Sequence, residues 1–213
     1  MRKRWAYCAR FTDNAPVFQG GPTQSGNTLH IVRAPRARDK PIATMHSAVS
    51  TLPVHPQPHR FSVKEYLAMG EAGILQPEDR VELVRGQVVS MSPIGHWHAV
   101  SVDRLSRLIY GQVPEAILVH VQNAVNFADD TQVQPDLALV RDRPGFWETG
   151  VREEDCLLVI EVAETSLETD RTRKLALYAA ACVPEYWIVD LEGRRVECYL
   201  SPEGEAYPQR SVQ

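Results

Sequence analysis

The stretch Cys156-Leu157-Leu158-Val159-Ile160-Glu161-Val162-Ala163 decides the fold, because it has the composition of a buried strand and carries one carboxylate, Glu161. An earlier stretch, Gln134-Pro135-Asp136, opens the apolar run 137–140, so a second carboxylate stands at the head of a second buried strand. A carboxylate in such a strand costs several kcal/mol unless it is paired or holds a metal ion. With Lys174 thirteen residues after Glu161, the two strands predict a metal-dependent site for phosphodiester cleavage.

The chain divides into two parts of opposite charge. Residues 1–60 carry nine Lys or Arg side chains and two Asp, a net of +7, whereas residues 61–213 carry 14 basic and 25 acidic side chains, a net of −11. The first part also holds seven of the fifteen prolines and shows no sustained apolar period. We therefore expect residues 1–58 to form a disordered basic leader and residues 59–213 to form the folded domain.

Two other interpretations of the leader stay open. A basic arm can contact nucleic acid, and Met45 lies just before the folded part, so the leader is also explained by the choice of start site. The leader lacks the continuous apolar core of a signal peptide, and the sequence has no run approaching the ~20 apolar residues of a membrane span. The four cysteines form no CxxC pair, which favours a reducing compartment and argues against zinc. We expect a cytoplasmic protein with no membrane partner and no organic cofactor.

Helix and strand patterns alternate through the folded part. Ser62-Val63-Lys64-Glu65 has the spacing of a capping box and predicts a helix that ends near 70–73. Further helices are predicted at 98–112 and 170–182, a hairpin at 80–91 with its turn at 85–86, strands at 117–122, 132–140, 156–163, 185–190 and 195–200, and a solvent loop at 141–155. This order predicts an α/β or α+β domain of about 150 residues with a mixed central sheet flanked by helices.

Several short motifs occur in this domain in a fixed order. The first is E-L-x-x-G-x-x-x-x-M-x-P, from Glu82 to Pro93, and His98 follows at the head of a predicted helix. Next come Pro135-Asp136, Glu161-Val162, Asp170 with Lys174, and the run Tyr178 to Asp190 with Glu185-Tyr186-Trp187 inside it. In these motifs the chain resembles the Uma2 family of restriction-endonuclease-like proteins, over roughly residues 61–200.

The resemblance implies a fold of the PD-(D/E)XK nuclease superfamily and cleavage of DNA that depends on Mg²⁺ or Mn²⁺. It implies catalytic roles for Asp136, Glu161, Lys174 and Glu82, with Asp136 and Glu161 as metal ligands and His98 as an orienting group behind them. The chemistry of the residues agrees, because a divalent ion takes hard oxygen ligands. Such an ion lowers the pKa of a bound water and stabilises the charge that grows on the phosphate.

One departure from the superfamily pattern concerns the lysine. It usually stands two residues after the glutamate on the same strand, and that position is Ala163 here. Lys174 on the following helix is the natural substitute, since an ammonium there can position or deprotonate a water. The direction in which Lys174 points cannot be read from helical spacing.

A structural explanation competes with each functional one. Lys174 can be a solvated helix residue, Glu82 an exposed hairpin residue and Asp136 a turn cap. Glu185 and Asp190 are expected to be structural strand ends, Glu164 and Glu168 loop charges, and His96 and His98 to point apart on their helix. At the level of function, the alternatives are a nuclease-like domain without activity that binds DNA or a partner protein, and a two-carboxylate hydrolase such as a glycosidase.

The expected partners are DNA and a second copy of the chain. An acidic domain binds phosphates poorly without a localised basic face, which Arg104, Arg107, Arg171 and Arg173 are candidates to supply. Cleavage of both DNA strands generally uses a two-fold dimer, although the sequence does not identify a dimer surface. The chain stops soon after Leu200, where family members continue, so a domain truncated at its C-terminus and lacking the final strand is a further alternative.

Overall fold

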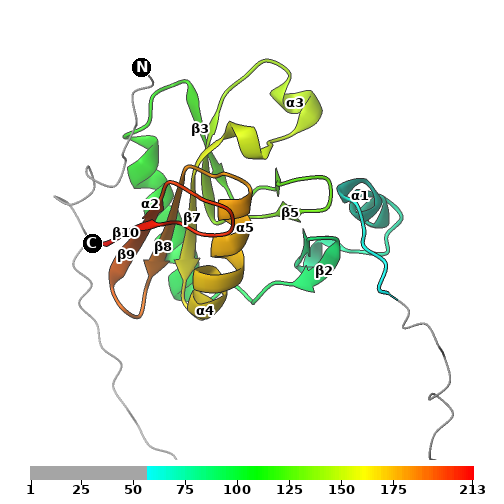
Figure 1. Ribbon diagram of the computed structural model, residues 1–213, viewed down its shortest axis with the longest axis horizontal. Helices are drawn as coiled ribbons and strands as arrows, with labels where there is room; N and C mark the ends of the chain where they lie inside the picture. The colour runs from blue at the N-terminus through cyan, green and yellow to red at the C-terminus, as the bar shows by residue number, and fades with distance from the viewer. Residues whose placement is uncertain (1–56) are drawn as a thin grey trace, which may run out of the picture. The chain divides into compact units, whose positions relative to one another are not determined.

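The computed structural model describes residues 57–213, and Figure 1 shows how their helices and strands are arranged. The larger of the two sheets in this part of the chain has the strand order β10-β9-β8-β7-β6-β3, and the smaller has the order β2-β1-β5-β4. The leader expected at 1–58, with its alternative start at Met45, lies outside the described residues except for Gln57 and Pro58.

The larger sheet is built around β7 (Cys156–Ala163), in which seven of eight residues are buried. Burial on both faces explains why this strand reads as a nearly continuous apolar run. β7 pairs in parallel with β8 (Glu185–Asp190) and antiparallel with β6 (Leu137–Arg141). The antiparallel strands β3 (Ile117–Val121), β9 (Arg195–Leu200) and β10 (Gln209–Val212) complete it. The mixed sheet with its helices confirms the predicted α+β fold class.

The smaller sheet begins with the hairpin of β1 (Val81–Val84) and β2 (Gln87–Ser90). Its two turn residues, Arg85 and Gly86, have φ angles of 49° and 75°, which is the geometry of a type I′ turn and suits the strand twist. β4 (Val125–Asn126) and β5 (Gln132–Val133) complete the sheet. α1 (Val63–Glu71) begins at the predicted capping box, and a 3-10 turn, Pro77–Asp79, leads into β1.

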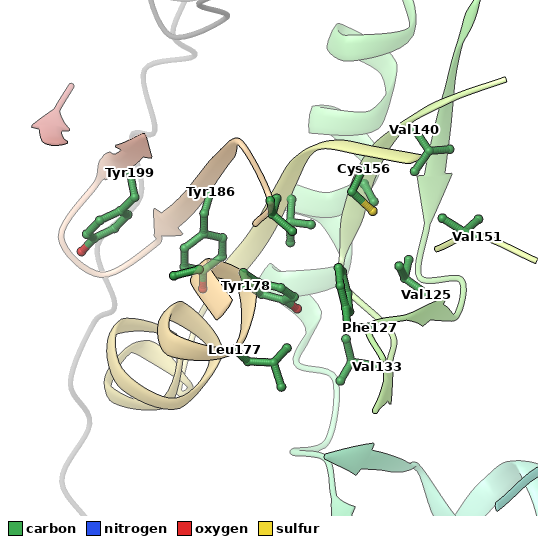
Figure 2. Close-up of a cluster of buried hydrophobic side chains, with 14 of the residues drawn as sticks. Val125, Phe127, Val133, Val140, Val151, Cys156, Leu177, Tyr178, Tyr186 and Tyr199 are labelled. Atoms are coloured by element: carbon green, nitrogen blue, oxygen red, sulfur yellow. The ribbon is translucent and has the colours of Figure 1, made fainter. Parts of the chain in front are cut away.

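Two groups of helices lie on opposite faces of the larger sheet (Figure 1). α2 (His96–Tyr110) contacts β3 and β7 on one face. On the other face the chain runs through α4 (Leu167–Thr169), a π-helical turn (Asp170–Lys174) and α5 (Leu175–Ala180). Figure 2 shows Tyr178 of α5 between Phe127 and Tyr186, with ring centroids 5.4 and 5.0 Å away. This aromatic cluster anchors α5 over β7 and β8.

Three predicted elements differ from the structure. The strand predicted at 132–140 is divided between β5 of the small sheet and β6 of the large one, because Pro135 has no N–H to continue a ladder. The predicted solvent loop at 141–155 contains α3 (Phe146–Thr149) and a 3-10 turn (Glu153–Asp155), with Phe146 and Val151 buried in the core. The helix predicted at 170–182 starts earlier, at Leu167, and includes the π-helical turn.

The C-terminal residues contribute a strand that was not predicted. β10 pairs antiparallel with β9 through four residue pairs, from Gln209–Leu200 to Val212–Glu197. The larger sheet therefore continues beyond Leu200. The alternative of a domain truncated at its C-terminus stays a prediction. None of the helices described in residues 57–213 is long and apolar enough to span a membrane.

Candidate active site

Asp136 directly precedes β6, and Glu161 lies on the neighbouring strand β7. β6 and β7 pair Leu137 with Ile160, and the same antiparallel register continued by one residue places Asp136 opposite Glu161. Opposed residues of an antiparallel pair project their side chains on the same face. The Oδ2 atom of Asp136 accepts a hydrogen bond of 2.8 Å from the Val162 amide, which ties the Asp136 carboxylate to β7 beside Glu161. The structure therefore brings together the two carboxylates on which the sequence-based site depends.

Lys174 points toward Glu161. Its Nζ atom lies 2.9 Å from Glu161 Oε1, and the hydroxyl of Tyr178 donates to the same oxygen over 2.5 Å. Lys174 ends the π-helical turn and Tyr178 lies one turn later on α5. Both therefore reach the same carboxylate from above the sheet, because i and i+4 share a helix face. The sequence left this direction open, and the tertiary structure decides it.

Burial and neighbouring charges set the charge states of Glu161 and Lys174. The pKa of Glu161 is raised to about 8, first of all by burial and then by the nearby charges of Asp136 and Asp170, against the opposing effect of Lys174. Burial lowers the pKa of Lys174, but the carboxylates of Glu161, Glu82 and Asp170 raise it by more, so the ammonium stays charged. Three carboxylates compete for one ammonium, which is the electrostatic environment that a divalent cation relieves.

His98 is the hydrogen-bond partner of Asp136. Its Nε2 atom lies 2.9 Å from Asp136 Oδ2, and this bond raises the pKa of His98 above its ordinary value. Burial raises the pKa of Asp136, but the bonds from His98 and the Val162 amide lower it by more, so the carboxylate is ionised. The ring of His96 contacts Trp97 instead, with centroids 5.7 Å apart. The two histidines therefore do not converge.

Glu82 also reaches the cavity, but as a partner of the backbone. It is buried on β1, and its Oε1 atom accepts a hydrogen bond of 2.7 Å from the Gln134 amide, two residues before Asp136. The side chain thereby links the small sheet to the segment that carries Asp136. Its charge also acts on Lys174, so the structure places all four expected catalytic residues around one cavity.

Three further residues of the cavity were not expected there. Asp170 is 1% exposed, and its Oδ2 atom accepts a 2.5 Å bond from Ser166. Gln122 donates to Asp136 Oδ1 over 3.3 Å. Glu164, expected as a loop charge, accepts a 3.3 Å bond from the amide of His98 at the start of α2. Only Asp170 had a sequence signal, its position four residues before Lys174.

The basic face proposed for DNA is partly occupied by internal ion pairs. Arg171 pairs with Glu197, which is fully buried on β9, and with Asp190 over 3.6 Å. Its guanidinium is therefore used within the fold. Arg104 and Arg107 are exposed on α2, and Arg173 lines the cavity. As expected, Glu185 and Asp190 act within the fold, since they accept bonds of 2.8 Å from Trp187 and 2.7 Å from the Gly193 amide.

The cavity has a volume of about 910 Å³ and is lined by residues of α1, β1, β2, the strand end at 161–162 and the π-helical turn. Its donor set fits a hard cation, because Asp136 and Glu161 supply carboxylate oxygens. In addition, the Oδ1 atom of Asp170 is buried and has no hydrogen-bond partner within residues 57–213. No group of three His, Cys, Asp or Glu side chains in that part of the chain is already arranged as a metal centre.

Comparison with known families explains this combination of motifs and geometry. The family described as "Putative restriction endonuclease", Uma2, matches residues 63–213. The chain belongs to the Uma2 family. The match extends past the motifs that the sequence alone shows and includes β10 of this Uma2 domain.

A solved structure shares the fold of this Uma2 chain. It is a putative nuclease of the DUF820 group from Anabaena variabilis, with a TM-score of 0.55 and 16% sequence identity, and the likeness covers 71% of this chain and 83% of that one. At this identity the likeness establishes a common fold. No curated protein matches the chain.

Proposed function

We propose that this Uma2 chain is a metal-dependent endonuclease that hydrolyses phosphodiester bonds of DNA. One observation carries the proposal. Asp136, directly before β6, lies opposite Glu161 of β7 when the Leu137–Ile160 register is continued by one residue, and Lys174 contacts Glu161 over 2.9 Å in the same cavity. Membership of a family described as a putative restriction endonuclease supports the choice of reaction.

The residues take distinct roles in this reaction. Asp136 and Glu161 would hold Mg²⁺ or Mn²⁺, and the bound ion supplies activation of the attacking water and stabilisation of charge on the phosphate. Lys174 contributes a fixed positive charge beside Glu161 and orients the nucleophile. His98 and the Val162 amide hold one oxygen of Asp136, which restricts the rotation of that carboxylate. Glu82 keeps the Asp136 segment in place through the Gln134 amide.

The second candidate is a nuclease-like domain that binds DNA or a partner protein without cutting. It is favoured by one observation. Both carboxylates already have protein partners, since Asp136 is bound by His98 and the Val162 amide, and Glu161 by Lys174 and Tyr178. Carboxylates that already have these protein partners do not by themselves require an ion.

Titration of Mg²⁺ or Mn²⁺ into the purified protein with plasmid DNA separates the two candidates. We expect nicking or linearisation that rises with metal and is abolished in Asp136→Ala, while the matched variant Asp103→Ala, altered on the exposed side of α2, cuts like the wild type. DNA retention in a binding assay, with no cleavage at any metal concentration, would support the inactive domain instead. Gel filtration of the same sample reports whether a dimer forms.

A further inference from the structure

Arg80 is held in a strained backbone conformation at the edge of the cavity. It lies between the 3-10 turn Pro77–Asp79 and β1, with φ 47° and ψ 65°. Left-handed geometry is uncommon for a long side chain, and residues kept in it are concentrated at functional sites. The Arg80 carbonyl accepts a 2.8 Å bond from the Met91 amide, which closes the β1–β2 hairpin and holds the residue in place.

The side chain of Arg80 lacks a partner where other arginines of the fold have one. Its Nε atom is buried without a hydrogen bond, and its guanidinium makes no ion pair with any carboxylate of residues 57–213. The half-buried Arg143 and Arg171 and the exposed Arg195 and Arg210 all pair with Asp155, Asp190 or Glu197. An unpaired buried donor is costly, so Arg80 is prepared for a group that the chain itself does not supply.

Arg80 lines the same cavity as the carboxylates of the candidate site. It is close enough to His98 for their charges to interact, and His98 Nδ1 is a second buried nitrogen without a partner in the described part of the chain. Elsewhere the cavity is dominated by carboxylates, which repel a phosphate. Arg80 and the exposed Arg173 are the guanidinium groups in the cavity wall that attract an anion, and Arg80 is the one with a buried donor that lacks a partner.

We propose that Arg80 binds a phosphate of the substrate strand next to the phosphate that is cleaved. The proposal rests on the proposed function and adds a substrate-binding residue to it. A guanidinium presents coplanar N–H donors that match the oxygens of a phosphate and keep their charge at any working pH. Such a contact positions the strand so that the next phosphodiester reaches Asp136, Glu161 and Lys174, and it carries no sequence information.

The first test measures anion binding without any cleavage. Inorganic phosphate is titrated into ¹⁵N-labelled protein, with Mg²⁺ present, and the arginine Nε–H resonances are followed. We expect a saturable shift of one resonance that is missing from the spectrum of Arg80→Gln and retained in the exposed control Arg141→Gln. A titration in which the Arg80 resonance does not move would overturn the proposal.

A second variant, Arg80→Gly, tests whether misfolding causes the loss of phosphate binding. Arg80→Gly removes the side chain and also relieves the left-handed backbone, because glycine adopts positive φ freely. We expect Arg80→Gly to melt at the wild-type temperature or above it and yet to bind phosphate more weakly than the wild type. Phosphate affinity equal to wild type in Arg80→Gly, measured by calorimetry, would show that the anion binds elsewhere.

The last arm uses DNA substrates in which one phosphate at a time is replaced by a neutral methylphosphonate. In the wild type we expect the methylphosphonate at one position beside the cut to lower kcat/KM about tenfold. This is the size of one lost charge-assisted hydrogen bond. In Arg80→Gln that position should have less than a twofold effect, with kcat nearly unchanged and KM raised. Cleavage with equal sensitivity in both proteins refutes the Arg80 contact and leaves the nuclease. Absence of cleavage, with the phosphate shift at Arg80 intact, refutes the nuclease and leaves the contact.

Discussion

Lys174 Nζ lies 2.9 Å from Glu161 Oε1, although a strand end, a turn and a π-helical turn separate the two residues in the chain. The resemblance found in the sequence implies a lysine two residues after the glutamate, and the chain has the buried Ala163 at that position. A side chain from the helix above the sheet thus reaches the carboxylate that a strand lysine would otherwise reach from β7.

Replacement of this lysine tests its role in the reaction. Lys174→Ala should lower the cleavage rate by roughly 10²-fold or more, because a preorganised charge beside the reacting phosphate is lost. Lys174→Arg should recover little, since a planar guanidinium neither reproduces a compact ammonium nor acts as a base. Single-turnover cleavage assays measure both, with Lys64→Ala on the exposed side of α1 as the control. Unchanged rates in Lys174→Ala would leave the carboxylates alone as the catalytic groups.

The raised pKa of Glu161 makes stability depend on pH. Because this pKa rises from 4.5 in the unfolded chain to about 8 in the folded one, the folded state binds the extra proton between these values. The contribution of Glu161 to stability is therefore complete below the lower pKa and decreases as pH rises toward 8. We expect Glu161→Gln to show a shallower fall in melting temperature over this window than the wild type. Parallel slopes in the two proteins would contradict the raised pKa.

Metal should stabilise the folded protein most at alkaline pH. An ion competes with the proton for Glu161, so the increase in melting temperature on addition of Mg²⁺ should be larger at pH 8 than at pH 6. Differential scanning fluorimetry measures this without any DNA. In Glu161→Gln the increase should be small at both pH values, and a full wild-type response there would place the metal elsewhere.

Another buried glutamate, Glu197, lies on a strand of the larger sheet away from the candidate site. Glu197 on β9 is 0% exposed, contacts Arg171, accepts a 2.7 Å bond from Tyr199 and pairs with Arg210 of β10 over 3.1 Å. Burial raises its pKa, but the arginines and Tyr199 lower it by more, to about 2. This stabilisation is present above the unfolded value of 4.5 and is lost as pH falls toward 2.

Glu197→Gln should therefore destabilise the domain by about 2–3 kcal/mol. This is less than the cost of breaking a fully buried ion pair, because the arginines are partly exposed. Urea unfolding at neutral pH measures the loss, and the exposed Glu203→Gln serves as the control. At acid pH the wild type and Glu197→Gln should converge. A difference that persists at pH 2 would mean that packing, and not charge, accounts for the effect.

Gly95 is required by the close approach of Glu164 to the start of α2. A Cβ atom at position 95 would lie 1.9 Å from Glu164 Oε2, so Gly95→Ala should displace this carboxylate from the amide of His98. Glu164 supplies the negative charge at the helix N-terminus, where the capping residue makes no side-chain bond. We expect Gly95→Ala and Glu164→Ala each to cost about 0.5–1 kcal/mol. In the double variant the costs should not add, because one interaction is removed twice; full additivity in urea unfolding would disprove the contact.

Much of the fold could be predicted because its signals are local. The capping box at Ser62, the Arg85-Gly86 turn and the apolar run of β7 each specify their element within a few residues. The segment 132–140 could not be assigned correctly, since its two halves belong to different sheets. The loop at 141–155 looked solvated from its charges, but Asp155 is paired with Arg143 over 2.6 Å and Phe146 is in the core.

The sequence by itself determined which side chains the site contains, because carboxylates in apolar strands and the spacing of the Uma2 motifs are properties of the chain. Only the tertiary structure decided how they meet. The register of β6 on β7 places Asp136 opposite Glu161, and the π-helical turn directs Lys174 onto that pair. The position of Arg80 in the cavity depends on packing between the hairpin and the larger sheet. Periodicity specifies the face of one element, whereas convergence of side chains depends on how separate elements pack, and no local pattern contains that information.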